Sequence, residues 1–118
     1  MTDSALRPFD EARTEEMVNF LWENADAAGL ATAKVRYEEN MLKVLRAVLM
    51  QDALEQSGGK LSVSAQERDA YAHPRYLEQV KKASRAVHEE QTQIGKRKAA
   101  IMQIDAWRTW NANHRTNV

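Results

Sequence analysis

The sequence predicts an all-α protein: a helical bundle built on a long, coiled-coil-like C-terminal helix, and a dimer. The stretch Pro74–Ala112 contains no further Pro and only one Gly, Gly95, and it starts with Pro at a favourable first helical position. A β-branched residue recurs at every seventh position of this stretch, at Val80, Val87, Ile94 and Ile101. Such a stripe cannot be buried by one helix alone. We therefore expect it to pair in a dimer or against the helix at residues 30–54.

The full seam expected on the long helix follows alternating spacings of four and three residues. Its members are Tyr76, Val80, Ala83, Val87, Glu90, Ile94, Arg97, Ile101, Ile104 and Arg108. Glu90 and Arg97 stand where apolar residues would pack better. The sequence leaves open whether these two pair across a symmetric interface or face water.

We expect the 118 residues to form a single domain. Before the break at Gly58-Gly59, the sequence predicts a flexible arm followed by two helices. We expect the arm at 1–8, and then a helix over 10–28 with Asp10 as its N-cap and Phe9 as a hydrophobic staple. Gly29 either ends this helix or bends it. The next helix, 30–56, is apolar around most of its circumference, which is typical of a central helix. Its apolar residues include Met41, Leu42, Val44, Leu45, Val48, Leu49, Met50 and Leu54.

Two further helices are predicted after the glycine break. Ser64, with Glu67 three residues later, has the pattern of a capping box and predicts a short helix over 64–72. The residue before a proline is biased away from helical geometry, so this helix should end before His73-Pro74. The long helix then covers 74–112.

The net charge of zero hides a strong polarity along the chain. From residue 71 onward there are nine Lys and Arg against four Asp and Glu, whereas the first seventy residues have eight against thirteen. On the long helix Lys81, Arg85, His88, Thr92 and Lys96 fall within a narrow arc, away from the Val/Ile stripe. Such an arc is either an ordinary solvent-exposed helix face or a surface that binds anions.

Enzymatic function is not indicated. The chain has no Cys, no phosphate-binding glycine loop and no metalloprotease or serine-hydrolase motif, and its three His residues are far apart in sequence. We therefore expect no catalysis, no cofactor, no metal and no small-molecule substrate. The polar first residues and the lack of a long apolar run predict a cytoplasmic protein that does not bind membranes.

The basic arc favours binding of double-stranded DNA without sequence preference, because lysine and arginine neutralise backbone phosphates whatever the bases are. The candidate DNA-binding residues are Lys81, Lys82, Arg85, Lys96, Arg97, Lys98, Arg108, Trp110 and Arg115. Trp110 could stack on a base or pack internally. For Trp107 we expect packing against another helix, in the region of Phe20 and Trp22.

Two segments, Tyr71-Ala72-His73-Pro74-Arg75-Tyr76-Leu77 and Ala106-Trp107-Arg108-Thr109 with Ala112-Asn113-His114-Arg115, bracket the long helix. They resemble a family of small, largely uncharacterised helical proteins of tailed bacteriophages, encoded in early regions near genes for single-stranded DNA-binding and recombination proteins. The resemblance covers mainly the C-terminal half and part of the helix at residues 30–54. It implies a role in phage DNA replication or recombination, in the host cell cytoplasm, and it implies no catalytic residues.

The rival hypothesis is a helical adaptor that binds a replication or recombination protein rather than DNA. In that case the acidic residues of the first helix would matter as much as the basic arc. These are Glu11, Glu15, Glu16, Glu23 and Asp26. They could equally hold the basic end of a neighbouring subunit.

Overall fold

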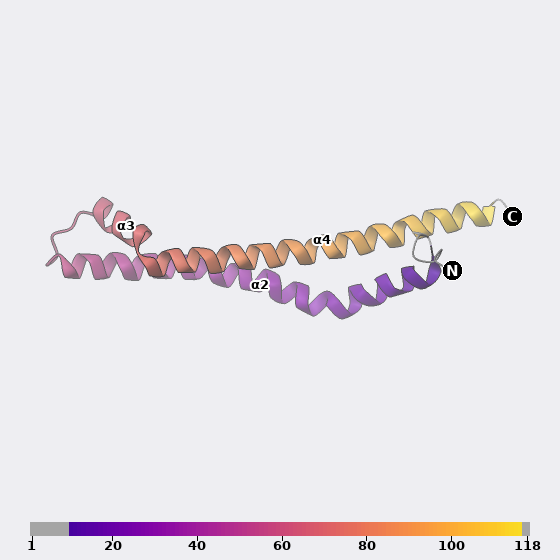
Figure 1. Cartoon of the computed structure of the whole chain (residues 1–118), viewed down its shortest axis with the longest axis horizontal. Helices are drawn as coiled ribbons and strands as arrows, with labels where there is room; N and C mark the ends of the chain where they lie inside the picture. The colour runs from indigo at the N-terminus through magenta and orange to yellow at the C-terminus, as the bar shows by residue number, and fades with distance from the viewer. Residues whose placement is uncertain (1–9, 117–118) are drawn as a thin grey trace. The chain divides into compact units, whose positions relative to one another are not determined.

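The computed structural model describes residues 10–116, with side chains up to His114, and this part of the chain consists of three helices without a strand (Figure 1). The helices are α2 (Glu11–Gln56), α3 (Val63–Ala72) and α4 (Pro74–Thr116). The predicted all-α class with one long C-terminal helix is confirmed. The expected arm at 1–8 and the expected staple at Phe9 lie outside the described residues.

Helix α2 begins where the sequence indicates and continues further than expected. Asp10 caps it, because its Oδ1 accepts a hydrogen bond from the main-chain N–H of Ala12 at 2.9 Å. The alternative in which Gly29 ends the first helix, so that separate helices cover 10–28 and 30–56, is wrong, since α2 runs through Gly29 as one helix of 46 residues. An interior glycine costs a helix only about 1 kcal/mol. The packing of residues on both sides of Gly29, described below, offsets that cost.

Replacing Gly29 or Gly95 by Ala is expected to raise the free energy of unfolding by about 0.5–1 kcal/mol for each change. Both glycines lie inside helices, and a Cβ added at either would meet no heavy atom within 4 Å. Urea unfolding followed by far-UV circular dichroism measures the change. Gly58→Ala is the control and should destabilise, because Gly58 has a φ of +71°. A loss of stability in Gly29→Ala would contradict a continuous α2.

A glycine turn ends α2. Gly58 and Gly59 have φ angles of 71° and 82°, in the left-handed region that favours glycine. The N–H of Gly59 donates to the carbonyl of Leu54 at 2.9 Å, and that of Gly58 donates to Glu55 at 3.0 Å. These two bonds form the Schellman arrangement that satisfies the last carbonyls of a helix. The break predicted at this point is therefore confirmed.

Helix α3 starts one residue before the predicted 64–72, and its cap differs from the prediction. The N-cap is Ser62, whose Oγ accepts from the N–H of Ala65 at 3.2 Å, so the expected capping role of Ser64 is wrong. His73 closes α3 with its main-chain N–H, which donates to Ala70. The Nδ1 of the same residue accepts from the N–H of Arg75 at 3.0 Å, within the first turn of α4. One residue thus ends α3 and caps α4, and Pro74 occupies the predicted first position.

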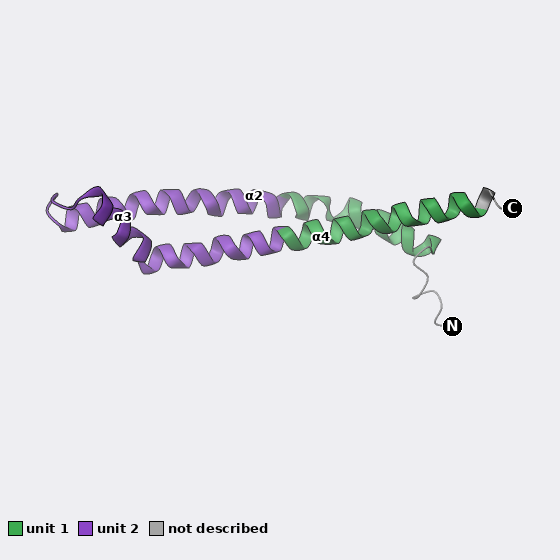
Figure 2. Cartoon of the chain, turned by 90° about the horizontal axis from the view of Figure 1, so that it is seen from above, with its two compact units in different colours: residues 1–29, 91–118 green, residues 30–90 purple. Residues whose placement is uncertain are grey.

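The chain forms two compact units, and α2 and α4 each contribute to both (Figure 2). Unit 1 comprises residues 1–29 and 91–118, and unit 2 comprises residues 30–90. In each unit a segment of α2 pairs antiparallel with a segment of α4, and unit 2 also contains α3.

Unit 2 has a helix pair with coiled-coil-like spacing. Buried and half-buried residues recur at alternating intervals of three and four on both helices. They are Ala31, Val35, Glu38, Leu42, Leu45 and Leu49 on α2, and Tyr76, Gln79, Ala83, Ala86 and Glu90 on α4. A buried hydrogen bond fixes the register, since the Nε2 of Gln79 donates to the main-chain carbonyl of Glu38 at 3.1 Å.

Helix α3 is fastened to α2 of unit 2 by polar and aromatic contacts. Arg46 Nη2 lies 3.0 Å from Glu67 Oε1, and the Arg46 guanidinium carbon lies 5.6 Å from the centre of the Tyr71 ring. Tyr71 meets Tyr76 edge to face, with ring centres 5.3 Å apart. Ala70, with 1% of its surface exposed, is the buried residue of α3. These contacts hold the start of α4 beside the end of α2.

Unit 1 has the same spacing but more polar contacts. The residues that face the partner helix are Thr14, Met17, Leu21, Asn24 and Ala28 on α2, and Gln93, Arg97, Ala100, Ile104, Trp107 and Asn111 on α4. Asn24 Nδ2 donates to Gln93 Oε1 at 2.7 Å. Arg97 Nη1 donates to the main-chain carbonyl of Leu21 at 3.0 Å and to Asn24 Oδ1 at 3.2 Å. Polar layers of this kind fix register at a cost in stability.

Half of the expected seam on α4 faces α2. Tyr76, Ala83 and Ile104 are buried or half-buried, as expected. Glu90 and Arg97, whose surroundings the sequence left open, are half-buried as well. The β-branched half is more exposed, since Val80, Val87, Ile94 and Ile101 are 38%, 39%, 38% and 47% exposed. Val80 and Val87 still line a shallow hollow together with Glu39 and Leu42 of α2. Residues one position earlier, Gln79, Ala86, Gln93 and Ala100, face α2 instead. Small residues allow two helices to approach closely, and the β-branched row then lies at the edge of the contact. Its pairing in a dimer stays a prediction.

Candidate nucleic-acid interface

Unit 2 presents three of the predicted DNA-binding cations on the outer side of α4. Lys81, Lys82 and Arg85 are all exposed. Because α4 turns Gln79, Ala83 and Ala86 toward α2, Lys81 and Arg85 point away from the helix pair, whereas Lys82 lies at the edge of the contact. None of the three cations forms an ion pair with a described residue. Their charges are therefore available to an anionic ligand.

Unit 1 presents two more exposed cations on α4 and buries a third. Lys96 and Lys98 are exposed and form no ion pair within residues 10–114. Arg97 is different, since it is half-buried and its guanidinium donates to the Leu21 carbonyl and to Asn24. Arg97 serves the helix pair and is not part of the surface proposed below.

The remaining candidates lie near the end of α4. Arg108 is exposed, and its Nη1 lies 3.8 Å from Asp105 Oδ1, one turn earlier on the helix. Trp110 is 38% exposed and its ring stacks on His114, with centres 4.2 Å apart. The side chain of Arg115 lies outside the described part of α4. Trp107 is half-buried at a position that faces α2, which agrees with the expected packing, whereas Trp22 is 80% exposed.

Acidic residues interrupt the cations without neutralising them. Glu78 and Glu89 are exposed on α4 on either side of Lys81, Lys82 and Arg85. Between these two glutamates the helix carries three cations and no acid. Separated cations of this kind suit an extended anionic ligand better than a single enclosed anion.

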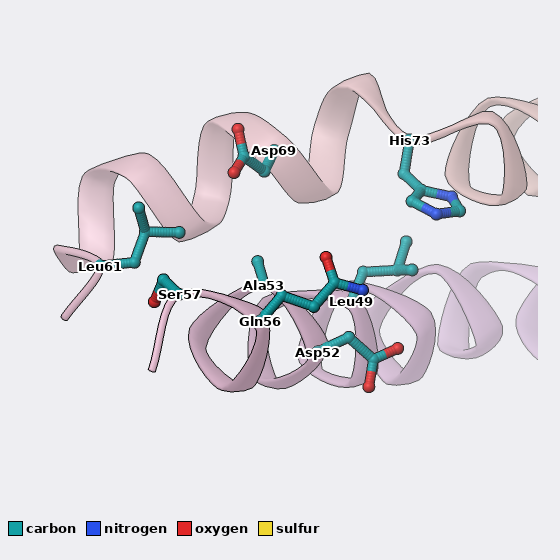
Figure 3. A pocket seen from close by; sticks show the side chains of 8 residues that line it. All are labelled: Leu49, Asp52, Ala53, Gln56, Ser57, Leu61, Asp69 and His73. Atoms are coloured by element: carbon teal, nitrogen blue, oxygen red, sulfur yellow. The ribbon is translucent and has the colours of Figure 1, made fainter. Parts of the chain in front are cut away.

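A cavity of about 340 Å³ lies between α3 and the end of α2 in unit 2, lined by Leu49, Asp52, Ala53, Gln56, Ser57, Leu61, Asp69 and His73. Figure 3 shows that the carboxylates of Asp52 and Asp69 point away from each other. No group of three or more metal-ligating side chains occurs among the described residues.

Three helices without a strand within residues 10–116 define this chain as an all-α protein. No protein-family model, curated protein or solved structure matches it. Within residues 10–116, no helix combines the length and the apolar character needed to cross a membrane.

The main feature that the sequence did not reveal is on α2 of unit 2. The helix expected to be central is covered on only part of its circumference, and Val44 and Val48 are 54% and 43% exposed. The signal was present in the sequence, because an apolar residue stands on almost every side of this helix. A single chain supplies too few neighbours to cover them all.

Proposed function

We propose that this protein is a non-enzymatic DNA-binding protein that binds double-stranded DNA without sequence preference through the exposed cations of α4. The observation that carries the proposal is the set of three exposed cations in unit 2, Lys81, Lys82 and Arg85, without an ion pair to any described residue. Lys96 and Lys98 supply further contacts from unit 1. Long basic side chains bind phosphates by releasing counterions, which requires no recognition of bases.

The resemblance to phage proteins gives this binding a setting in phage DNA replication or recombination, in the host cytoplasm. Non-specific binding to duplex suits such a setting because the protein must act along any sequence. We further propose that the protein acts as a homodimer, which doubles the number of phosphate contacts per assembly.

Lys81→Glu combined with Arg85→Glu is expected to weaken binding to random-sequence duplex equally for all sequences. The slope of log K against log salt should fall in magnitude by roughly 0.9 for each lost contact. Fluorescence anisotropy at about 50 mM and about 200 mM salt measures both quantities.

The matched control is Arg36→Glu combined with Lys43→Glu, which makes the same change of net charge on exposed residues of α2 in the same unit. This control should lose much less affinity than the α4 variant. An equal loss would mean that only the net charge matters. An unchanged affinity in the α4 variant would refute the assignment of these residues.

The acidic segment of α2 favours the adaptor as a second candidate. Glu11, Glu15, Glu16, Glu23 and Asp26 are all exposed, so α2 offers a basic protein partner a surface of opposite charge. The two functions differ in their response to substitution. Replacing these acids by their amides should leave duplex binding intact or strengthen it, and should weaken only a protein interaction.

A further inference from the structure

An apolar row runs along α2 within unit 2, on a side that neither α3 nor α4 covers. Leu30, Tyr37, Val44 and Val48 are 65%, 61%, 54% and 43% exposed, and Met41 is half-buried between them. Their spacing places all five on one face of the helix. A row of this length on a helix that is apolar nearly all round indicates a missing neighbour.

The two ends of this row carry opposite charges. Lys34, Met41, Val48 and Glu55 follow one another at intervals of seven residues, so they lie in one line along the helix. Lys34 is exposed and forms no ion pair with a described residue. Glu55 is exposed as well, and its Oε1 accepts from Gln51 Nε2 at 3.2 Å. The line therefore begins with a cation, continues with two apolar residues and ends with an anion.

We propose that this row is the contact between two copies of the chain, with their α2 helices antiparallel about a two-fold axis near Val44. In that arrangement Met41 lies opposite Val48 of the second copy, and the two copies of Val44 lie next to each other beside the axis. Lys34 then lies opposite Glu55 of the second copy, twice by symmetry. A two-fold contact requires a surface that complements itself. Two antiparallel copies of a line with opposite charges at its ends meet this requirement, because each cation then lies opposite an anion.

The β-branched row on α4 does not complement itself in this way. Continued at its seven-residue spacing, the row leads to His73 at one end and Arg108 at the other, and neither end has an acid. If two copies of this row paired antiparallel, His73 of one copy would lie opposite Arg108 of the other, so no cation would meet an acid. Val80 and Val87 also belong to unit 2 and Ile94 and Ile101 to unit 1, whereas the α2 row lies within unit 2. The α2 row is therefore the better dimer contact.

A charge swap tests the proposal without DNA. Lys34→Glu and Glu55→Lys should each weaken self-association by about tenfold, because each change breaks two symmetric pairs and creates two repulsive ones. The double variant Lys34→Glu/Glu55→Lys should restore the original dimer affinity, since both pairs are re-formed with reversed sign. Sedimentation velocity over a concentration series measures these affinities.

The absence of restoration in the double variant would overturn the antiparallel contact. So would a wild-type protein that stays monomeric at every concentration tested. If Val87→Lys dissociates the dimer and Val44→Lys does not, the α4 row is the contact instead. Circular dichroism on each variant verifies that it is folded.

Cysteine cross-linking tests the position of the two-fold axis independently. The chain has no native Cys, so a single introduced thiol can react only with its own copy in the partner. Val44→Cys should give a disulfide-linked dimer under mild oxidation, because the axis brings the two positions together. Tyr37→Cys is the control and should not, because its partner would lie near Gln51 of the second copy. Equal cross-linking of the two variants would refute the proposed axis.

The outcome of these tests is separate from that of the DNA-binding test. None of Lys34, Val44 and Glu55 is a proposed DNA contact, and oligomeric state is measured in the absence of nucleic acid. A failed charge swap leaves the assignment of Lys81 and Arg85 untouched, and a failed DNA-binding measurement by anisotropy leaves the dimer contact untouched.

Discussion

Leu49→Ala is expected to lower the free energy of unfolding by about 2–5 kcal/mol. Leu49 has 4% of its surface exposed, the lowest exposed fraction among the large apolar side chains in the described part of the chain. It faces α4 in the helix pair of unit 2 and also lines the cavity beneath α3, whose volume is about 340 Å³. Removing its isopropyl group enlarges a space that is already incompletely filled, so the neighbours cannot close the gap.

Urea unfolding of the wild type and the variant at one protein concentration measures this loss, since self-association makes stability depend on concentration. Leu77→Ala is the matched control, because it makes the same chemical change in the same unit at a residue that is 50% exposed. Its effect should stay below about 1 kcal/mol. Similar losses in the two variants would show that Leu49 is not in the core.

Ala86→Leu is expected to destabilise unit 2 by about 1–3 kcal/mol through overpacking. Ala86 is 2% exposed and faces α2. The hydrogen bond from Gln79 to the Glu38 carbonyl sets the register, and seven residues further along each antiparallel helix Ala86 comes level with Ala31. Two alanines at one level permit close approach of the helices, and a leucine there forces them apart.

The control for this change is Ala47→Leu, which adds the same group at an exposed position of α2. We expect that control to change stability by no more than about 0.5 kcal/mol. Denaturant midpoints and slopes distinguish the two cases, because a separated helix pair also exposes more surface before unfolding. If Ala86→Leu is tolerated as well as Ala47→Leu, the helices of unit 2 do not pack as closely as the structure indicates.

Local signals in the sequence predicted the elements well where the chain must break. Gly58-Gly59 requires positive φ angles, and Pro74 cannot continue a preceding helix, so both breaks follow from covalent geometry. Gly29 does not end the helix, because an interior glycine lowers helix stability only slightly. Contacts distant in sequence decide whether the helix continues. The N-cap of α3 is Ser62 rather than the predicted Ser64, and the sequence could not distinguish them because several serines near the start of the helix could fill that role.

The sequence could not show which of two adjoining rows on α4 faces α2, the row with Val80 and Val87 or the row with Gln79 and Ala86. Val80 and Val87 are the more apolar residues, but the helix pair buries Ala83 and Ala86 with Gln79. Periodicity alone identifies a stripe about as wide as both rows together, and only the approach of α2 decides which row is covered. The same ambiguity affected Arg97, which could belong to the seam or to the basic face.

The predicted basic face depends less on tertiary contacts. Lys81 and Arg85 are exposed as the helical arc predicts, because a long polar side chain opposite a packed seam has nowhere else to lie. Lys82, which lies beside that arc, is exposed as well. What such a face binds is a question of ligand chemistry, and the charge-reversal experiment answers it.

Two side chains of α4, Gln79 in unit 2 and Arg97 in unit 1, bind main-chain carbonyls of α2, those of Glu38 and Leu21. A carbonyl is present whatever amino acid occupies its position. Mutational drift at residues 21 and 38 would therefore leave both anchors in place, whereas the donors themselves cannot change without loss. Among divergent descendants of this gene, we expect glutamine at 79 and arginine at 97 to persist longer than the residues they bind.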